Sequence, residues 1–187
     1  MKVTQTKLPE VLIIEPEAFG DARGFFLETF SQKRYEKAGI KLPFVQDNVS
    51  LSAKNVLRGL HFQYPNAQGK LVQVLSGEVF DVVVDIRVGS PTFGQWAAEN
   101  LSASNHKQLY VPPDFAHGFC VISDTAIFSY KCTEYYNSAA EGGVIFSDPD
   151  LNIPWPVTAP IVSGKDARFP RLKDIPQKNL PKFKEPG

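Results

Sequence analysis

The stretch that decides the fold reads Leu71-Val72-Gln73-Val74-Leu75-Ser76-Gly77-Glu78-Val79-Phe80-Asp81-Val82-Val83-Val84-Asp85-Ile86. Two runs rich in β-branched residues are separated by Ser76-Gly77, a pattern that predicts a β-hairpin. In the second run apolar side chains alternate onto one face of the strand, namely Phe80, Val82, Val84 and Ile86. The other face carries acidic residues at intervals. We therefore expect one side of this strand to pack on a core and the other to meet a cavity or solvent.

Outward from this stretch, short strand signals recur along the chain, at 11–14, 25–30, 95–101, 108–111, 118–123 and 125–133. A single early helix is expected to begin at the capping residue Ser31 and to end at Gly39. After Ile153 the chain becomes rich in proline, which predicts a surface wrap with short helical turns. Many short strands with turns between them favour a sandwich or barrel. We predict one mainly β domain over residues 1–187, with a barrel core at about 45–150.

Composition excludes several classes of function. The 187 residues carry 20 Lys plus Arg and 20 Asp plus Glu, so the broad positive field that attracts nucleic acid or an anionic membrane is lacking. No apolar run is long enough to cross a bilayer, and the N-terminus does not resemble a signal peptide. Cys120 and Cys132 lie in apolar segments, as reduced core thiols do. We expect a cytoplasmic protein with no nucleic-acid or membrane partner.

The segment from Arg58 to Gln63 carries the most chemistry. Strand alternation would place His61 and Gln63 on one face, toward a cavity, and Arg58 on the opposite face with Leu60 and Phe62. From spacing alone, a structural histidine in the core is an equally good interpretation. An adjacent antiparallel strand could bring Lys70 close to His61. A lysine next to this histidine would favour a functional site over a structural histidine.

Three further clusters each have a plain alternative. A proline-bounded turn over 112–119 delivers His117, although turn histidines are usually just solvated. Tyr130 shares a strand face with Phe128 and could be a core tyrosine whose hydroxyl finds a partner. The loop from Ser163 to Asp166 could be an ordinary surface turn.

A metal site is not expected. The chain has three histidines, His61, His106 and His117, and Gln63 occupies the second position of a His-x-His pair. Lys70 stands where a carboxylate ligand would be needed, and its charge would repel a divalent ion. Glycine-rich phosphate loops are also absent from the sequence. A nucleotide would therefore be held by side chains, with Arg23, Arg58 and Lys70 as candidates.

Ordered motifs from Val11 to Asp166 resemble the dTDP-4-dehydrorhamnose 3,5-epimerase family. They are Asp21-x-Arg23-Gly24-x-Phe26-x-Glu28, Gln46-x-Asn48-x-Ser50-x-Ser52, Val56 to Gln63, Gly69-Lys70-Leu71-Val72, Gly77 to Arg87, Ser90 to Gly94, Phe115-Ala116-His117-Gly118-Phe119 and Ser163-x-Lys165-Asp166. The resemblance implies a mainly β, cupin-type jelly-roll β-barrel with a few short helices. It also implies a homodimer without metal or other cofactor, whose N-terminal strands lie in the dimer contact.

The same resemblance implies a reaction and a set of roles. The substrate would be dTDP-4-dehydro-6-deoxy-D-glucose, epimerised at C3 and C5 in dTDP-L-rhamnose biosynthesis. His61 matches the catalytic base, Asp166 its orienting carboxylate, Tyr130 the general acid and Lys70 the residue that holds the enolate oxygen. The substrate-binding positions are Arg23, Phe26, Glu28, Gln46, Asn48, Arg58, His117, Tyr136, Glu141 and Lys165.

The family pattern is not matched everywhere. Asn55 and Asp114 stand where the family usually has glycine, and we expect Asp114 to tolerate the left-handed backbone that such a turn needs. The resemblance also implies that the segment around Arg23 to Glu28 reaches into the partner subunit's site.

Other functions remain open at this point. A related enzyme could invert only one of the two carbons. A non-catalytic sugar-binding barrel would need affinity but no acid–base pair, and a metal-dependent oxygenase could use the same fold.

Overall fold

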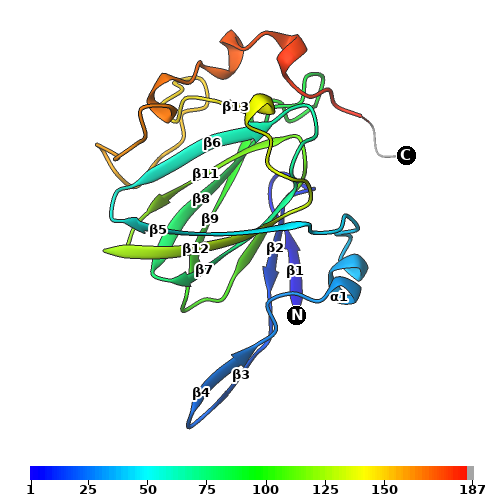
Figure 1. Ribbon diagram of the computed structural model, residues 1–187, viewed down its shortest axis with the longest axis vertical. Coiled ribbons are helices and arrows are strands. Elements are labelled where there is room, and N and C mark those ends of the chain that lie inside the picture. Colours follow the sequence, from blue (N-terminus) through cyan, green and yellow to red (C-terminus); the bar gives the residue numbers. More distant parts are fainter. Residues whose placement is uncertain (185–187) are drawn as a thin grey trace.

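The computed structural model describes residues 1–184 and contains two main sheets that lie face to face (Figure 1). The six-stranded sheet has the order β1-β2-β10-β7-β12-β5, and the five-stranded sheet has the order β13-β6-β11-β8-β9. Their strands are β1 Lys2–Gln5, β2 Leu12–Glu15, β5 Gln46–Ala53, β6 Leu57–Gln63, β7 Lys70–Ser76, β8 Glu78–Asp85, β9 Trp96–Ser102, β10 Gln108–Val111, β11 Phe115–Val121, β12 Thr125–Cys132 and β13 Glu141–Gly143. The predicted mainly β, jelly-roll architecture is confirmed.

The fold-deciding stretch forms two strands, as predicted, but they do not pair with each other. β7 lies between β10 and β12, whereas β8 lies between β11 and β9 in the other sheet. Gly77, with φ +79°, is therefore a corner at which the chain crosses between sheets, and a side chain there would collide with the backbone of Thr125. The prediction of a hairpin was wrong, because a Ser-Gly turn suits either connection.

Strand β8 is buried on both faces. Val79 and Val83 join the core between the two sheets, and the alternate residues Phe80, Val82 and Val84 face the outer side. The expectation that one face would be free of the core was wrong, because Val79, Asp81 and Val83 on the inner face are all 0% exposed.

The C-terminal segment covers the outer face of the five-stranded sheet. Leu151, Ile153 and Leu180 pack there on Leu60 and Val82. The short 3₁₀ helices of this segment are η2 Asp166–Arg168, η3 Leu172–Asp174 and η4 Gln177–Asn179, and η1 Ser138–Ala140 lies just before β13. Burial of these apolar side chains ties the segment to the barrel, so that its first 3₁₀ helix can carry a side chain into the site.

Within residues 1–184 the outer face of the six-stranded sheet is covered only in part, where Tyr35 and Ile40 pack on Ile14, Leu71 and Tyr110. Val49, Leu51 and Leu75 are 66%, 67% and 51% exposed. A two-stranded hairpin, β3 Ala18–Asp21 and β4 Gly24–Leu27, projects away from the two sheets (Figure 1). Together these elements leave a large apolar surface on one side of the chain.

The connecting elements agree with their sequence signals in most respects. Helix α1 spans Gln32–Lys37 with Ser31 at its N-cap, although the Ser31 side chain makes no capping hydrogen bond, and Gly39 follows with φ +95°. Asp114 and Asn55 adopt φ +73° and +65°, so the turns that usually contain glycine survive with these residues. No helix in the described chain is long and apolar enough to cross a membrane.

Candidate active site

A cavity of about 310 Å³ opens between the two sheets and gathers most of the chemistry-bearing side chains. It is lined by Ser50, Arg58, His61, Lys70, His117, Phe119, Phe128, Tyr130, Tyr136 and Glu141. A cleft of about 200 Å³ shares five of these residues and adds Gln46, Asn48, Phe62, Gln63 and Gln68. The cavity and the cleft together form the candidate site.

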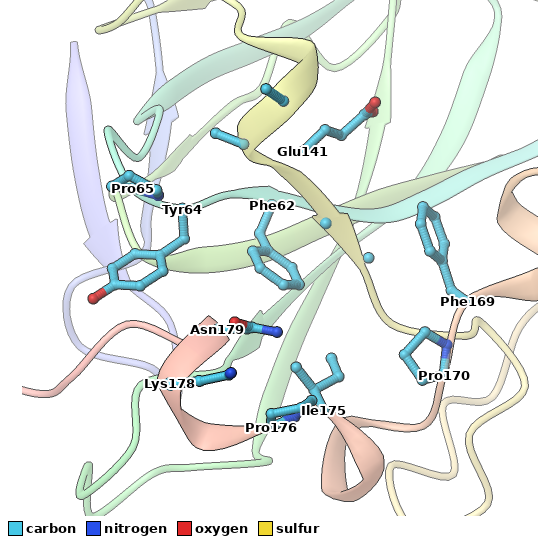
Figure 2. A pocket seen from close by; sticks show the side chains of 14 residues that line it. Phe62, Tyr64, Pro65, Glu141, Phe169, Pro170, Ile175, Pro176, Lys178 and Asn179 are labelled. Atoms are coloured by element: carbon cyan, nitrogen blue, oxygen red, sulfur yellow. The ribbon is translucent and has the colours of Figure 1, made fainter.

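A larger hollow, about 540 Å³, is lined by residues of β6, β13 and the C-terminal segment (Figure 2). Its walls include three aromatic side chains, Phe62, Tyr64 and Phe169, and three prolines (Figure 2). It shares Glu141 with the cavity between the sheets but none of that cavity's histidines. Size therefore does not identify the site in this chain, whereas the clustering of titratable groups does.

A β-bulge places Arg58 and His61 on the same side of β6. The register between β6 and β11 pairs His61 with His117 but Arg58 with Phe119, so β6 contains one extra residue. A Cβ at Gly59 would lie 2.5 Å from the Gly118 Cα, which explains why glycine occupies this position. Simple alternation, which placed Arg58 on the outer face, was wrong for this reason.

His61 forms a hydrogen-bonded pair with Asp166. The His61 Nε2 lies 2.9 Å from Asp166 Oδ1, and the Gly59 amide donates to Oδ2 at 3.1 Å. Burial alone would raise the pKa of Asp166, but the bond to His61, its charge and the Gly59 amide hold this pKa below its usual range. An ionised Asp166 accepts the Nε2 proton, which leaves the lone pair of His61 on Nδ1.

Lys70 approaches His61 from the opposite sheet. The expectation of an adjacent antiparallel strand was wrong, since β6 and β7 belong to different sheets. Within residues 1–184, the Lys70 ammonium makes no ion pair or hydrogen bond with another side chain. Burial lowers the pKa of Lys70, opposed by acidic groups around it that include Asp81 and Glu141. Lys70 is thus a cation available to an anion inside the cavity.

Tyr130 lies on β12, in the wall of the cavity opposite β6. Its ring centroid is 5.9 Å from that of Phe128, and burial raises the pKa of its hydroxyl above the usual value. The interpretation of Tyr130 as a purely core residue does not hold, because it lines both the cavity and the cleft.

At the base of the cavity, His117 is bonded to a second carboxylate, Asp81. The His117 Nε2 lies 2.9 Å and 3.0 Å from the two oxygens of Asp81. Burial raises the pKa of Asp81, and the charges of His117 and Lys70 offset this only in part. We had not assigned Asp81 to the site from the sequence. The available signal was an acidic residue in the middle of an otherwise β-branched run.

The mouth of the site is a hydrogen-bonded cluster. The Tyr136 amide donates to Gln46 Oε1 at 2.9 Å, and its hydroxyl donates to Glu141 Oε2 at 3.0 Å. Lys165 Nζ donates to Glu141 Oε1 at 2.7 Å, and Gln46 Nε2 donates to Asn48 Oδ1 at 3.1 Å. Five of the predicted binding residues, Gln46, Asn48, Tyr136, Glu141 and Lys165, are therefore brought together at one opening.

Three predicted binding residues lie away from this opening. Arg23 is on the projecting hairpin and bonds to Asp21, Phe26 is 72% exposed, and Glu28 pairs with Arg34 at 3.3 Å. None of them lines the cavity of the same chain.

Comparison with known proteins decides the family. The family model described as dTDP-4-dehydrorhamnose 3,5-epimerase matches residues 5–174. This chain belongs to that family. The epimerase of this name from Shigella flexneri is 56% identical over 176 residues, which cover 93% of this chain and 97% of that protein. The chain is accordingly an isomerase, as the sequence motifs predicted.

Two solved structures of the epimerase family bear on the details. The dTDP-6-deoxy-D-glucose-3,5-epimerase of Legionella pneumophila, in complex with dTDP-4-keto-L-rhamnose, has a TM-score of 0.96 and 51% identity, covering 98% of both chains. A 3′-monoepimerase of Streptomyces bikiniensis, in complex with dTDP-quinovose, has a TM-score of 0.90 and 33% identity, covering 95% of this chain and 92% of that one. The Legionella 3,5-epimerase is thus more similar to this chain than this mono-epimerase, in both identity and TM-score, which favours the 3,5-epimerase over the mono-epimerase alternative.

Proposed function

We propose that this epimerase inverts C3 and C5 of dTDP-4-dehydro-6-deoxy-D-glucose through an enolate, with His61 as base and Tyr130 as acid. The observation that carries the proposal is the placement of these two groups. His61 belongs to the five-stranded sheet and Tyr130 to the six-stranded sheet, and both line one cavity with Lys70. A flat intermediate between the sheets would have a proton-transfer group on each face.

Asp166 prepares His61 for proton removal. The hydrogens on C3 and C5 are acidified by the C4 ketone, and a neutral imidazole can accept one of them. Asp166, whose pKa is held low, fixes the tautomer with the lone pair on Nδ1 and favours the imidazolium that forms.

Lys70 stabilises the charge that develops. When the proton leaves, negative charge moves to the C4 oxygen. The Lys70 ammonium has no ion-pair partner within residues 1–184, so it binds that oxyanion more strongly than it binds the neutral ketone. Such differential binding accelerates the reaction.

Tyr130 completes the inversion. A single base would return the proton to the face from which it came, so epimerisation needs a donor on the other face. The raised pKa of Tyr130 keeps its hydroxyl protonated until the enolate takes the proton.

The proposal is tested by deuterium uptake in heavy water with dTDP-4-dehydro-6-deoxy-D-glucose as substrate. We expect deuterium at both C3 and C5, with inversion at both carbons. Deuterium at one carbon alone would favour a mono-epimerase, and sugar binding without any exchange would favour a non-catalytic barrel. His61→Asn should fold normally and lose exchange by about a thousandfold or more.

We further propose that two copies of the chain complete each other's sites. The hairpin with Arg23 and Phe26 projects from the barrel, and Phe19 and Phe25 on it are 58% and 62% exposed. Contiguous exposed apolar surface of this kind is typical of protein interfaces. The nucleotide would lie between the partner's hairpin and the mouth at Tyr136 and Lys165.

Light scattering should give the mass of a dimer, and Phe26→Asp should weaken both association and nucleotide binding. A fully active monomer would contradict the shared site. The two buried, unpaired cysteines, Cys120 and Cys132, support a reducing, cytoplasmic location.

A further inference from the structure

Ser50 Oγ is the one buried side-chain nitrogen or oxygen within residues 1–184 that has no hydrogen-bond partner. Ser50 also lines the cavity between the two sheets. A buried hydroxyl without a partner is costly, and native proteins contain few of them. A hydroxyl of this kind inside a ligand cavity marks a place where a ligand atom supplies the missing bond.

The neighbours of Ser50 on β5 are all satisfied. Alternate residues of this strand, from Gln46 to Ser52, are polar and face the interior. Gln46 bonds to Asn48, Asn48 Nδ2 lies 3.6 Å from Cys132 Sγ, and Ser52 Oγ accepts from Arg58 Nε at 3.0 Å. Among these inward-facing polar residues of β5, Ser50 is the one whose side chain has no hydrogen-bond partner. It lies between the mouth of the site and Arg58.

Ser50 faces an apolar residue across the strand pair. Its partner across the strand pair is Phe128, whose ring stacks on Phe119 with centroids 4.1 Å apart. Arg58, held by Ser52, lines the same cavity. A hydroxyl group of a ligand could therefore accept a hydrogen bond from Arg58 while donating one to Ser50, or accept a hydrogen bond from both.

We propose that Ser50 binds the C2 hydroxyl of the hexose and thereby selects sugars that carry this group. The inference rests on the proposed epimerase reaction and adds a specificity-determining residue to it.

The C2 hydroxyl is favoured because it stays in place during the chemistry. The C4 oxygen carries the enolate charge and, in the proposed reaction, is bound by Lys70. The C3 hydroxyl changes face when C3 inverts, and the C6 methyl group does so when C5 inverts. The C2 hydroxyl keeps its configuration throughout, so a donor fixed on a rigid strand can hold it across both inversions.

The test compares two substrates with Ser50→Ala. One is dTDP-4-dehydro-6-deoxy-D-glucose and the other is its 2-deoxy analogue, and kcat/KM is measured for deuterium uptake at C5. We expect the variant to lose about tenfold on the parent sugar and nothing on the analogue, because loss of one neutral hydrogen bond has this size. The wild-type enzyme should lose about the same factor on the analogue.

Two further variants make the result interpretable. Ser129→Ala removes a hydroxyl from the outward-facing side of β12 and should leave both substrates unaffected. Ser50→Thr keeps a hydroxyl and should retain the preference for the parent sugar, and it also serves if Ser50→Ala does not fold. An equal loss on both substrates, or no loss on either, would overturn the role of Ser50. Absence of exchange in the wild-type enzyme would instead overturn the proposed function.

Discussion

The chain contains two histidine–aspartate pairs with the same Nε2–oxygen distance of 2.9 Å but in different surroundings. In the pair near the mouth, the His61 side chain is 28% exposed and the Asp166 carboxyl has a lowered pKa. In the pair at the base, His117 is 6% exposed and Asp81, at 0%, has a raised pKa. At the base, burial thus raises the carboxyl pKa more than attraction to the histidine lowers it. Near the mouth, attraction and hydrogen bonds lower the carboxyl pKa more than burial raises it.

The two pairs are therefore suited to different tasks. An ionised Asp166 can orient His61 and stabilise the imidazolium that forms in each turnover. Burial raises the pKa of Asp81 and leaves His117 only 6% exposed, so this pair is better suited to be a fixed part of the cavity floor. Under the proposed function, two pairs of the same residue types at equal distance serve as a proton-transfer group in one place and as a structural support in the other.

The largest expected effect is on activity, where changing the aspartate of each pair should have very different consequences. Asp166→Asn should lower kcat/KM for C5 exchange by about a thousandfold to ten-thousandfold, because the amide no longer enforces the tautomer or balances the imidazolium. Asp81→Asn should cost far less, since an amide can still bond to His117 and Asp81 takes no part in the proposed proton transfer. Steady-state rates of deuterium uptake measure both, and equal losses would contradict the division of roles.

The second expected effect is on stability, where loss of the aspartate at the base should cost more than loss of the aspartate near the mouth. Asp81→Ala should lower the free energy of unfolding by about 3 kcal/mol, because it leaves His117 buried without its partner. Asp166→Ala should lower it by about 1 kcal/mol, since His61 near the mouth can bond to water. Urea unfolding at neutral pH measures both, and a larger loss for Asp166→Ala would contradict the assignment.

The smallest expected effect is in the pH dependence. Lys70 must be protonated to hold the enolate, and its lowered pKa should bring the alkaline fall in kcat/KM below the pH of about 10.4 expected for a free lysine. Tyr130 shifts in the opposite direction and should not limit the rate there. In Lys70→Arg the alkaline limb should move upward with a lower maximum rate. An unchanged limb would remove Lys70 from the oxyanion role.

Sequence reasoning found the elements of the fold more reliably than their neighbours. The strands on either side of Ser76-Gly77 were predicted closely, yet their pairing was not. Which sheet each strand enters depends on β11 and β12, more than thirty positions further along the chain. That information is not present in the local alternation.

The site shows the same limit at the level of single residues. Alternation placed His61 correctly but misplaced Arg58, because the bulge at Gly59 shifts the pattern by one residue. The pairing of His61 with Asp166, 105 positions apart, could be predicted only through resemblance to a family. The sequence shows Asp81 as a charged residue within an apolar strand, but it does not indicate that Asp81 pairs with His117.

The central claim is that proton transfer occurs from both faces of one flat intermediate. Tyr130→Phe, assayed in heavy water with dTDP-4-dehydro-6-deoxy-D-glucose, tests it most directly, by mass spectrometry for deuterium and by NMR for configuration. We predict that His61 still exchanges the sugar hydrogens with solvent while inversion at C5 is lost. Full inversion at both C3 and C5 in this variant would contradict the account.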